Sequence, residues 1–263
     1  MNASFASTAR RIWPPVVFGI GFVALWEAVV KVFDLKPYFL APPSRIFDEF
    51  TDNLGNIWDA VKVSGTNAFI GLLIGTVLGV AMSFILSRFR VLNDVVTPLA
   101  IALNAIPIFV LVAVFNNMFA ITSEVPRRLM VTLVVYFVVL VNVAKGLTQV
   151  SNTQLELMRS YAASDTEILR KVRVPNAVPY LFTALKIAAP LSVITAFVSE
   201  YFGGSQNGLG YAISSNTSTS KNALAWAYVL GACLLGLAFY LISIMLETAA
   251  TPGGGSTRAE GRA

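Results

Sequence analysis

Six long apolar segments constrain the fold of this chain more than any other feature of its sequence. Each is close to the roughly 20 residues that an α-helix needs to cross the hydrocarbon core of a bilayer. Composition agrees, because 56% of the residues are hydrophobic and only 13% are charged, whereas a soluble domain has about 45–50% and about 25%. The sequence therefore predicts an all-α integral membrane protein with six transmembrane helices, over about residues 13–33, 64–87, 95–115, 129–147, 181–201 and 223–247.

The basic residues orient this predicted bundle. With a cytoplasmic N-terminus, twelve of the 19 Lys and Arg residues lie inside and seven outside, the direction of the positive-inside rule. The inner residues are Arg10, Arg11, Arg88, Arg90, Lys145, Arg159, Arg170, Lys171, Arg173, Lys186, Arg258 and Arg262, and the outer ones are Lys31, Lys36, Arg45, Lys62, Arg127, Arg128 and Lys221. We therefore expect both termini to be cytoplasmic in a multi-pass protein.

This topology divides the chain into three parts. Residues 1–12 form a cytoplasmic N-terminal tail, and residues 13–248 form the transmembrane domain, with a cytoplasmic loop over residues 150–180. The remaining residues, 249–263, are Gly-rich and lack an apolar face, so we expect a disordered tail. The first apolar segment ends with Glu27 and Lys31 and lacks a small-residue cleavage site, which indicates a retained helix rather than a signal peptide.

Several kinds of chemistry are excluded by residue content. The chain has no histidine and a single cysteine, Cys233, so it has no His-based catalysis, no imidazole metal site and no intrachain disulfide. It also lacks the G-x-x-x-x-G-K-[ST] loop that cradles phosphates and the G-x-S-x-G and H-E-x-x-H signatures of hydrolases. We expect a protein that is not an enzyme and binds no metal or cofactor of its own. A net charge of +5 fits loop topology rather than nucleic-acid binding.

Three glycines in the second apolar segment follow a regular spacing. Gly71, Gly75 and Gly79 recur every four residues, which places them on one helix face. Small residues on one face let a second helix approach closely within the membrane. Helix packing inside the chain is the preferred interpretation, although a dimer seam or a moving contact would produce the same spacing.

The fifth apolar segment ends with an acid, Glu200, followed by the glycine-rich stretch "YFGGSQNGLGYAISSN". Glycines there favour sharp turns of the backbone over a continuing helix. Two interpretations remain open. The stretch is either a plain connector or an outer gate at the mouth of a pore, in which case Glu200, Gly208 and Gly210 are its candidate residues.

The densest charge falls in "ELMRSYAASDTEILRKVRVP", residues 156–175, between the fourth and fifth apolar segments. Apolar residues recur there at steps of three and four, with charged residues at other positions. This pattern predicts an amphipathic helix or helical pair that ends before Pro175. Such a helix can lie on lipid or dock in a groove of a soluble partner, and the pattern alone leaves both open.

The same stretch resembles the signature loop of permeases of binding-protein-dependent ABC importers. That loop reads E-A-A, three residues, G, nine residues, then I-x-L-P. This chain keeps the spacing with Glu156, Leu157 and Met158, then Ala162 in place of Gly, then Val172, Val174 and Pro175. The stretches "APPSRIFDEF", "VPNAVPYLFTALKIAAP" and "SEYFGGSQNGLGYAI" resemble other segments of these permeases, so the resemblance covers about residues 10–248. It is strongest to the branch that serves nitrate, sulfonate, taurine, bicarbonate, and pyrimidine or flavin precursors.

The resemblance implies a function for the whole chain. It implies the type I ABC importer permease fold in a bacterial cytoplasmic membrane, forming the path for a small solute delivered by an extracytoplasmic binding protein. The 156–175 loop would be a coupling helix docked on cytoplasmic ATPase subunits, which bind ATP and Mg²⁺, and a second permease copy or paralogue would complete a dimer. A stand-alone secondary transporter is the alternative, but such proteins usually show inverted repeats and buried midplane charges, neither of which is evident here.

Overall fold

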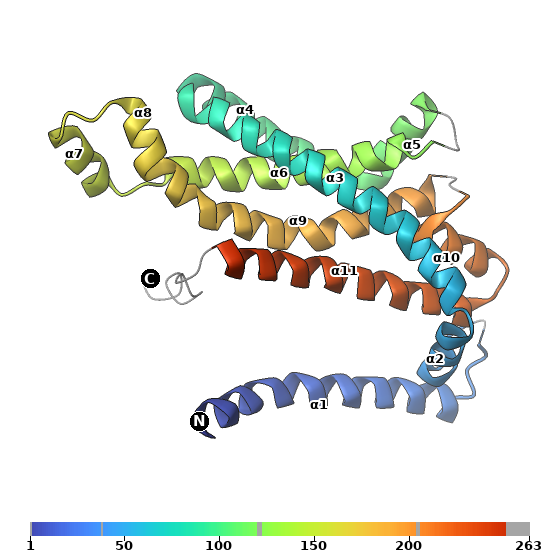
Figure 1. Cartoon of the computed structure of the whole chain (residues 1–263). Coiled ribbons are helices and arrows are strands. Elements are labelled where there is room, and N and C mark those ends of the chain that lie inside the picture. Colours follow the sequence, from blue (N-terminus) through green and yellow to red (C-terminus); the bar gives the residue numbers. More distant parts are fainter. Residues whose placement is uncertain (1, 38, 120–122, 204–205, 251–263) are drawn as a thin grey trace. The chain divides into compact units, whose positions relative to one another are not determined.

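The computed structural model describes residues 2–37, 39–119, 123–203 and 206–250, and its regular elements are helices. Figure 1 labels the α-helices: α1 (Asn2–Val32), α2 (Pro43–Asp52), α3 (Leu54–Arg88), α4 (Arg90–Asn104), α5 (Ile108–Met118), α6 (Val125–Thr148), α7 (Asn152–Ser160), α8 (Asp165–Ile168), α9 (Val174–Phe202), α10 (Gly208–Ser218) and α11 (Asn222–Ala250). The π-helical turn η1 (Leu169–Arg173) connects α8 to α9. Gly204 and most of the predicted disordered tail, residues 251–263, lie outside the described residues.

Five helical stretches of the described chain are long and apolar enough to cross a membrane. They are Trp13–Val32, Leu54–Arg88, Val125–Thr148, Asp165–Phe202 and Asn222–Ala250. Each contains or largely overlaps one of the six predicted apolar segments, so the all-helical, multi-pass character expected from the sequence is confirmed.

The third predicted segment, residues 95–115, differs from its expected form because it is not one continuous helix. It is divided between α4 and α5, with a break at residues 105–107. Pro107 causes the break, since proline has no backbone N–H to continue the helix and disfavours helical geometry at the residue before it. Of these two helices, α5 is a short apolar helix of 11 residues, well below the length that spans a bilayer alone.

The chain forms two compact units, residues 1–59 with 212–231 and residues 60–211 with 232–263. In the first unit, α1 contacts α2 and the start of α11. The rings of Trp26 and Trp226 meet edge to face with centroids 5.5 Å apart, and Trp26 packs against a small core of Ala41, Ile46 and Ala223. Aromatic pairs in this geometry add about 0.5–1.5 kcal/mol to the effect of buried area.

A charged residue of α1 also fixes the start of α2. The Glu27 carboxylate accepts hydrogen bonds from the backbone N–H and the hydroxyl of Ser44, at 3.0 and 2.8 Å, and pairs with Lys31 at 2.8 Å. A carboxylate at the first turn of α2 satisfies a backbone donor that the helix cannot satisfy itself. The contact gives Glu27 and Lys31 a structural role within the first unit.

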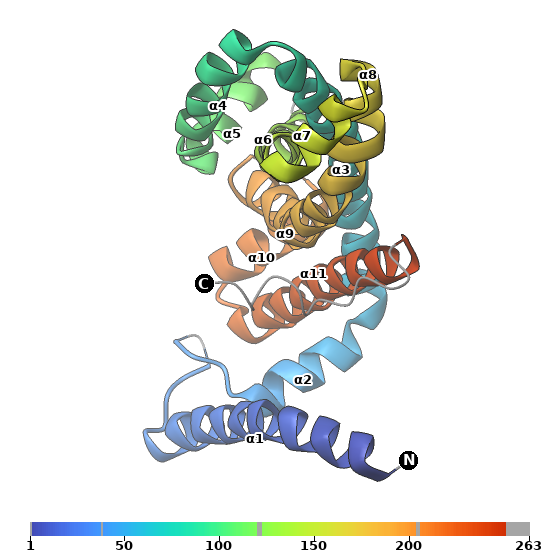
Figure 2. The ribbon, with the colours of Figure 1, turned by 90° about the vertical axis from the view of Figure 1, so that its left-hand side faces the viewer.

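The second unit is built around α6 and α9, which lie side by side in Figures 1 and 2. Their contact buries a continuous row of aliphatic side chains, which includes Val131, Val135, Val139, Val143, Leu147, Ala184, Ala188 and Ala196. In the chain, α7, α8 and η1 connect the C-terminal end of α6 to the N-terminal end of α9. The two core helices are therefore joined at one end by the charged stretch of the sequence.

The three regularly spaced glycines of α3 face this core. A Cβ added to Gly75 would lie 2.7 Å from the Thr132 carbonyl oxygen, and one added to Gly79 would lie 2.9 Å from that of Tyr136. A Cβ on Gly71 would collide with the Val131 side chain. These positions bring the α3 backbone against α6 with no room for a side chain, which is the close approach that small residues permit.

Candidate functional site

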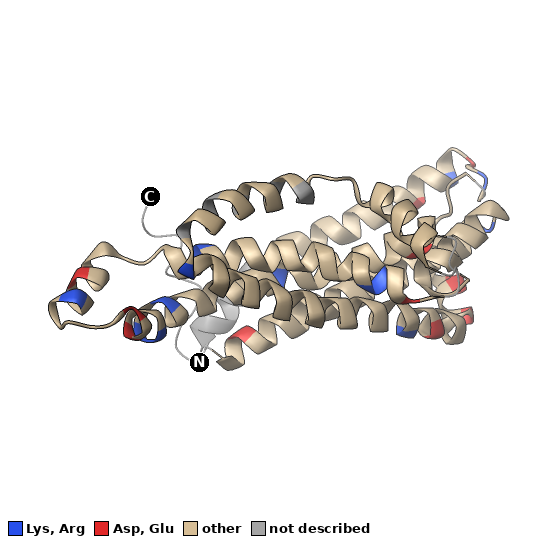
Figure 3. Cartoon of the chain, turned by 90° about the horizontal axis from the view of Figure 1, so that it is seen from above, with Lys and Arg blue, Asp and Glu red and all other residues tan. Residues whose placement is uncertain are grey.

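The charged segment, residues 152–173, consists of α7, α8 and η1 and is largely exposed. No residue of α7 is buried, and the apolar side chains of Leu157 and Tyr161 are 56% and 77% exposed. Figure 3 shows both acidic and basic residues on this segment, at the left of the view. Glu156 is exposed, Met158 is half-buried, and Val172 and Val174 are half-buried at the far end. Apolar and charged side chains of this segment are therefore exposed next to one another, and no other part of the described chain covers them.

The turn between α7 and α8 centres on Ala162. Its φ is +52°, in the left-handed region that favours glycine. The Ala162 N–H donates to the Arg159 carbonyl at 2.9 Å and the Ala163 N–H donates to the Met158 carbonyl at 3.0 Å, which is the hydrogen-bond pattern of a Schellman helix end. The sharp turn is present although alanine replaces the glycine of the family pattern, and the left-handed alanine costs about 1–2 kcal/mol relative to ordinary helical geometry.

The second half of the charged segment begins with a capping box. The Glu167 N–H donates to the Ser164 hydroxyl at 3.3 Å, and the Ser164 N–H donates to the Glu167 carboxylate at 3.0 Å. This reciprocal pair satisfies donors at the start of a helix that would otherwise lack partners. Lys171 then pairs with Glu167 at 3.2 Å, four residues along. Local hydrogen bonds therefore define the start of α8, while Ile168 is buried and Asp165 lies 3.9 Å from the Arg88 guanidinium of α3.

The predicted helix end before Pro175 is wrong. Helical structure continues from Asp165 through Pro175 to Phe202, and Pro175 lies in the first turn of α9. The π-helical turn η1 immediately before it explains this difference. A π turn shifts the hydrogen-bonding pattern by one residue, and a proline in the first turn of the following α-helix has no donor to lose.

The junction of α6 and α9 fixes the base of the charged segment. The Asn176 side-chain amide donates to the carbonyls of Gly146 and Gln149, at 2.7 and 3.0 Å. A Cβ on Gly146 would lie 2.8 Å from both the Ala177 Cα and the Tyr180 ring. The exposed segment therefore projects from a closely packed base.

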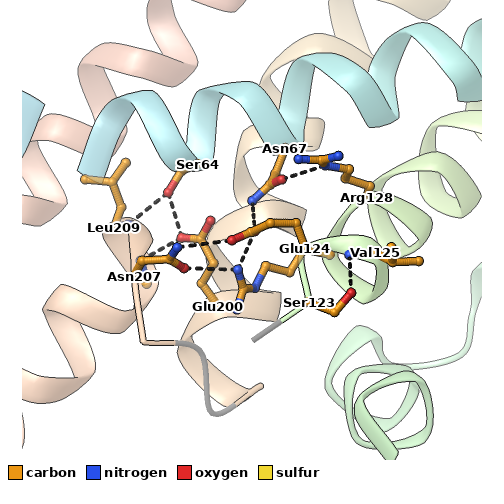
Figure 4. Close-up of polar contacts among 11 residues, drawn as sticks. Ser64, Asn67, Ser123, Glu124, Val125, Arg128, Glu200, Asn207 and Leu209 are labelled. Carbon is orange, nitrogen blue, oxygen red and sulfur yellow. Dashed lines mark hydrogen bonds and ion pairs between the residues drawn. The ribbon is translucent and has the colours of Figure 1, made fainter. Parts of the chain in front are cut away.

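At the other end of α9, Glu200 holds the chain that follows it. This carboxylate is only 1% exposed. Its Oε2 accepts a hydrogen bond from the Ser64 hydroxyl at 2.6 Å and one from the Gly210 N–H at 3.1 Å, and the Leu209 N–H donates to the Ser64 oxygen at 2.8 Å. Figure 4 shows these side chains converging from α3, α9 and the start of α10. The Glu200 carboxyl thus satisfies the first N–H groups of α10, that of Gly210 directly and that of Leu209 through Ser64.

Two glycines make this approach possible. Gly208 has φ +89°, and a Cβ there would collide with the Glu200 carboxylate. A Cβ on Gly210 would lie 2.6 Å from the Tyr201 nitrogen and 2.8 Å from the Glu200 Cβ. The structure thus brings together Glu200, Gly208 and Gly210. It also turns part of the expected loop into a helix, since α10 begins at Gly208.

A second polar network adjoins the first. The Glu124 carboxylate accepts hydrogen bonds from Asn67 at 2.6 Å, from Asn207 at 3.1 Å and from the Arg127 guanidinium. Arg127, which is 4% exposed, also donates to the Asn207 side-chain oxygen at 3.1 Å. We call the two networks together the carboxylate clamp, made of Ser64, Asn67, Glu124, Arg127, Glu200 and Asn207.

The electrostatics of Glu124 follow from these contacts. Partial burial raises the pKa of this carboxyl, but the hydrogen bonds from Arg127, Asn67 and Asn207 outweigh burial and lower the pKa below its ordinary value of 4.5. The clamp therefore stabilises the ionised form of Glu124. Among the described residues, no group of three or more Cys, Asp or Glu side chains is placed to hold a metal ion.

Most of the clamp was not predicted from the sequence. Ser64, Asn67, Glu124, Arg127 and Asn207 are common polar residues at the ends of apolar segments. Ser64 is 136 residues from its partner Glu200, and Glu124 is 57 residues from Asn67 and 83 from Asn207. The one available signal was the i, i+3 spacing of Glu124 and Arg127 at the start of a span, which favours an ion pair.

Comparison with known proteins identifies relatives over most of the chain. The family described as "Binding-protein-dependent transport system inner membrane component" matches residues 71–252. A probable ABC transporter permease protein of Haemophilus influenzae is 26% identical over 231 residues, covering 88% of this chain and 93% of that protein. The formylaminopyrimidine transport permease protein ThiX of Halalkalibacterium halodurans is 29% identical over 201 residues, covering 75% and 78%. The taurine transport system permease protein TauC of Escherichia coli is 21% identical over 224 residues, covering 79% and 81%.

Solved structures share the fold. A chain of the MetNI methionine ABC transporter, in an inward facing conformation, aligns with a TM-score of 0.58 at 18% sequence identity. The alignment covers 75% of this chain and 95% of that chain. This structural similarity concerns the fold, and it agrees with the expected type I ABC importer permease fold.

Proposed function

The chain belongs to the family of binding-protein-dependent transport system inner membrane components, and from this premise we propose how it works as the permease subunit of an ABC importer. It forms the translocation path for a small solute across the inner membrane, and a separate subunit hydrolyses ATP. Relatives named for taurine, riboflavin, bicarbonate and aliphatic sulfonates indicate a small polar solute as cargo. The chain itself carries no phosphate-cradling loop.

The charged segment is the docking site for the cytoplasmic ATPase in this proposal. The observation that carries it is the exposure of Leu157 and Tyr161 on a segment projecting from a closely packed base. Exposed apolar side chains among charged ones are typical of a protein interface rather than of a lipid contact alone. The motif residues Glu156, Leu157, Met158, Ala162, Val172, Val174 and Pro175 would then form the coupling helix and its connection to α9.

The remaining assembly follows from the same assignment. ATP and Mg²⁺ bind to the ATPase subunits, an extracytoplasmic protein delivers the solute, and a second copy of this chain or a paralogue completes the path. Both termini and the charged segment lie in the cytoplasm, as the charge distribution predicts. Glu200, Gly208 and Gly210 then lie at the outer end, where the turn after α9 acts as part of an outer gate.

Topology tests this arrangement directly. Reporter fusions at Asn53 and Ser215 should report an external location, and fusions at Asp165 and at the C-terminus an internal one. An external location for Asp165 would contradict docking of the charged segment on a cytoplasmic ATPase.

The docking assignment has its own experiment. The tagged chain is purified in mild detergent from its native host, and co-purifying subunits are identified. We expect an ABC ATPase with the wild-type chain and its loss in Leu157→Glu, because a buried unpaired charge in the interface opposes binding. Thr153→Glu is the matched control, since it adds the same charge to the same exposed helix outside the motif. Retention of the ATPase by Leu157→Glu, or uptake by the purified chain without any ATPase, would contradict the proposal.

A further inference from the structure

The charged segment and the carboxylate clamp are connected by one helical element. Asp165–Phe202 is helical without interruption over 38 residues, a length of about 57 Å at 1.5 Å per residue. A bilayer with its headgroup regions is about 40–45 Å thick. The element, which contains Pro179 and Pro190, therefore reaches from the charged segment at one end to Glu200, two residues before its other end.

Glu200 determines what moves with that second end. Its Oε2 accepts the Ser64 hydroxyl and the Gly210 N–H, and Ser64 in turn accepts the Leu209 N–H. These bonds connect α9 both to α3 and to the first turn of α10. The close contact of Gly208 and Gly210 with Glu200 leaves no space for a side chain between the carboxylate and the chain that turns back toward it. The start of α10 is thereby held to α9 by one carboxylate.

The neighbouring network holds the same turn from another helix. Asn207, directly before Gly208, is bound by Glu124 and Arg127 at the start of α6. The turn over residues 207–210 is thus fastened to α6 through Glu124 and to α9 through Glu200. If α9 moves relative to α6 and α3, the hydrogen bonds of Glu200 and Glu124 must stretch or exchange partners.

One oxygen of Glu200 remains unused in this arrangement. Within the described residues, Glu200 Oε1 is buried and has no hydrogen-bond partner. A buried carboxylate oxygen without a partner is unfavourable, so a purely structural clamp would be expected to satisfy both oxygens. The free oxygen gives Glu200 the capacity to accept a different donor in a second arrangement of the same helices.

We propose that Glu200 is the positioning residue through which displacement of α9 is transmitted to the turn at residues 207–210 and to α10. The inference rests on the proposed function, since it requires a partner that displaces the charged segment. Ser64 acts with Glu200 because its hydroxyl bridges the carboxylate to the Leu209 N–H. Loss of either side chain should leave the subunits assembled but weaken the connection between ATP hydrolysis and solute uptake.

The test uses the complete complex in proteoliposomes, with the co-purified ATPase, the binding protein and its solute. The variants are Glu200→Gln, which replaces the carboxyl by an amide of the same shape, and Ser64→Ala, which removes the bridge. The control is Ser192→Ala, because Ser192 is an equally buried hydroxyl on α9 that bonds only to its own helix, at the Ala189 carbonyl. The readout is solute taken up per ATP hydrolysed, which a loss of folded protein alone does not change.

Glu200→Gln should lower this ratio about tenfold, because an amide changes the hydrogen bonds to both Ser64 and Gly210, and Ser64→Ala about threefold, because one bridging hydroxyl is lost. Ser192→Ala should stay within about twofold of wild type. A wild-type ratio in both clamp variants overturns the inference and leaves the proposed function intact. An equal fall in Ser192→Ala overturns it too, because the effect would then be general packing.

Two further outcomes are informative. If Glu200→Gln yields no folded complex, Ser64→Ala decides alone, and a wild-type ratio in that variant counts against the inference. If the wild-type chain takes up solute with no ATPase present, the proposed function itself fails, and the transmission role of Glu200 fails with it.

Discussion

The two ends of α9 are built in opposite ways. The N-terminal end leads out of the charged segment, where α7 has no buried residue and Leu157 and Tyr161 are exposed. The C-terminal end carries Glu200, a carboxylate that is buried and hydrogen-bonded to two other elements. One helix therefore connects a region where buried polar groups from several elements are hydrogen-bonded to one another, with Glu200 Oε1 left over, to a region that leaves apolar side chains uncovered.

The two ends differ in how their side chains are covered. A buried carboxylate is retained only when hydrogen bonds and nearby charges compensate its lost hydration, and the carboxylate clamp supplies them from α3, α6 and α10. Exposed Leu and Tyr side chains, in contrast, gain stability only when another surface covers them. The clamp end is thus held by contacts within the chain, whereas the exposed apolar side chains of the charged segment are the ones that the proposed ATPase contact would cover.

The largest effect should follow a change at the clamp end, Gly208→Val. A Val there has an unfavourable positive φ, which costs about 1–2 kcal/mol, and its Cβ would collide with the Glu200 carboxylate, which adds about 1–3 kcal/mol of overpacking. We expect solute uptake to be lost while the ATPase still co-purifies, since the charged segment is untouched.

Uptake and co-purification are measured side by side for Gly208→Val. The control is Gly236→Val on α11, where an added Cβ meets no atom within 4 Å. Wild-type uptake by Gly208→Val would show that the turn after α9 is an ordinary connector with no special role in transport.

A change at the exposed end, Ala162→Trp, should affect the partner rather than the fold. Ala162 is exposed and already left-handed, so a larger side chain adds little strain within the chain but places a ring in the proposed interface, where overpacking costs about 1–3 kcal/mol. Insertion and thermal unfolding of the isolated chain should stay near wild type, while ATPase co-purification or coupled uptake falls. Thr153→Trp, outside the motif, should be milder. Full retention of binding, stimulated ATPase activity and uptake by Ala162→Trp would argue against docking here.

The opposite change, Ala162→Gly, should stabilise the turn between α7 and α8, with a smaller effect than that of Ala162→Trp. Glycine removes the left-handed penalty, partly offset by its greater freedom when unfolded, so the turn should gain about 1 kcal/mol. Hydrogen exchange should slow by about fivefold at the backbone amides of positions 162 and 163, which donate to the Arg159 and Met158 carbonyls. Faster exchange would contradict the Schellman geometry at this turn.

The smallest effect concerns the pH dependence of the clamp through Glu124. Because its pKa in the folded chain is lowered, Glu124 stabilises the fold above its unfolded pKa, near 4.5, and this contribution is lost as pH falls through the lower folded value. The side chain is 26% exposed, so the effect should be modest. Thermal unfolding in detergent should drop below pH 4.5 more steeply for wild type than for Glu124→Gln. Parallel pH profiles would show that the clamp does not depend on this ionisation.

Much of the fold was available from the sequence because lipid imposes simple rules. Apolar runs of spanning length predicted the five long helices, and the spacing of Gly71, Gly75 and Gly79 predicted a face for close helix approach. The exception was the segment over residues 95–115, where apolar character was correct but Pro107 divides the helix. Periodicity also placed helices in the charged segment, yet it could not show that η1 carries the helix past Pro175.

The sequence by itself determined the class of the protein and the motif of its charged segment, since hydrophobic length and residue spacing are local properties. It also marked Glu200, Gly208 and Gly210 as unusual. Only the tertiary structure joined them to Ser64, and joined Glu124 and Arg127 to Asn67 and Asn207. The reason is physical, because a buried polar group takes as its hydrogen-bond partner whichever donor the packing of distant helices brings within about 3 Å. The local sequence pattern around either residue does not contain that information.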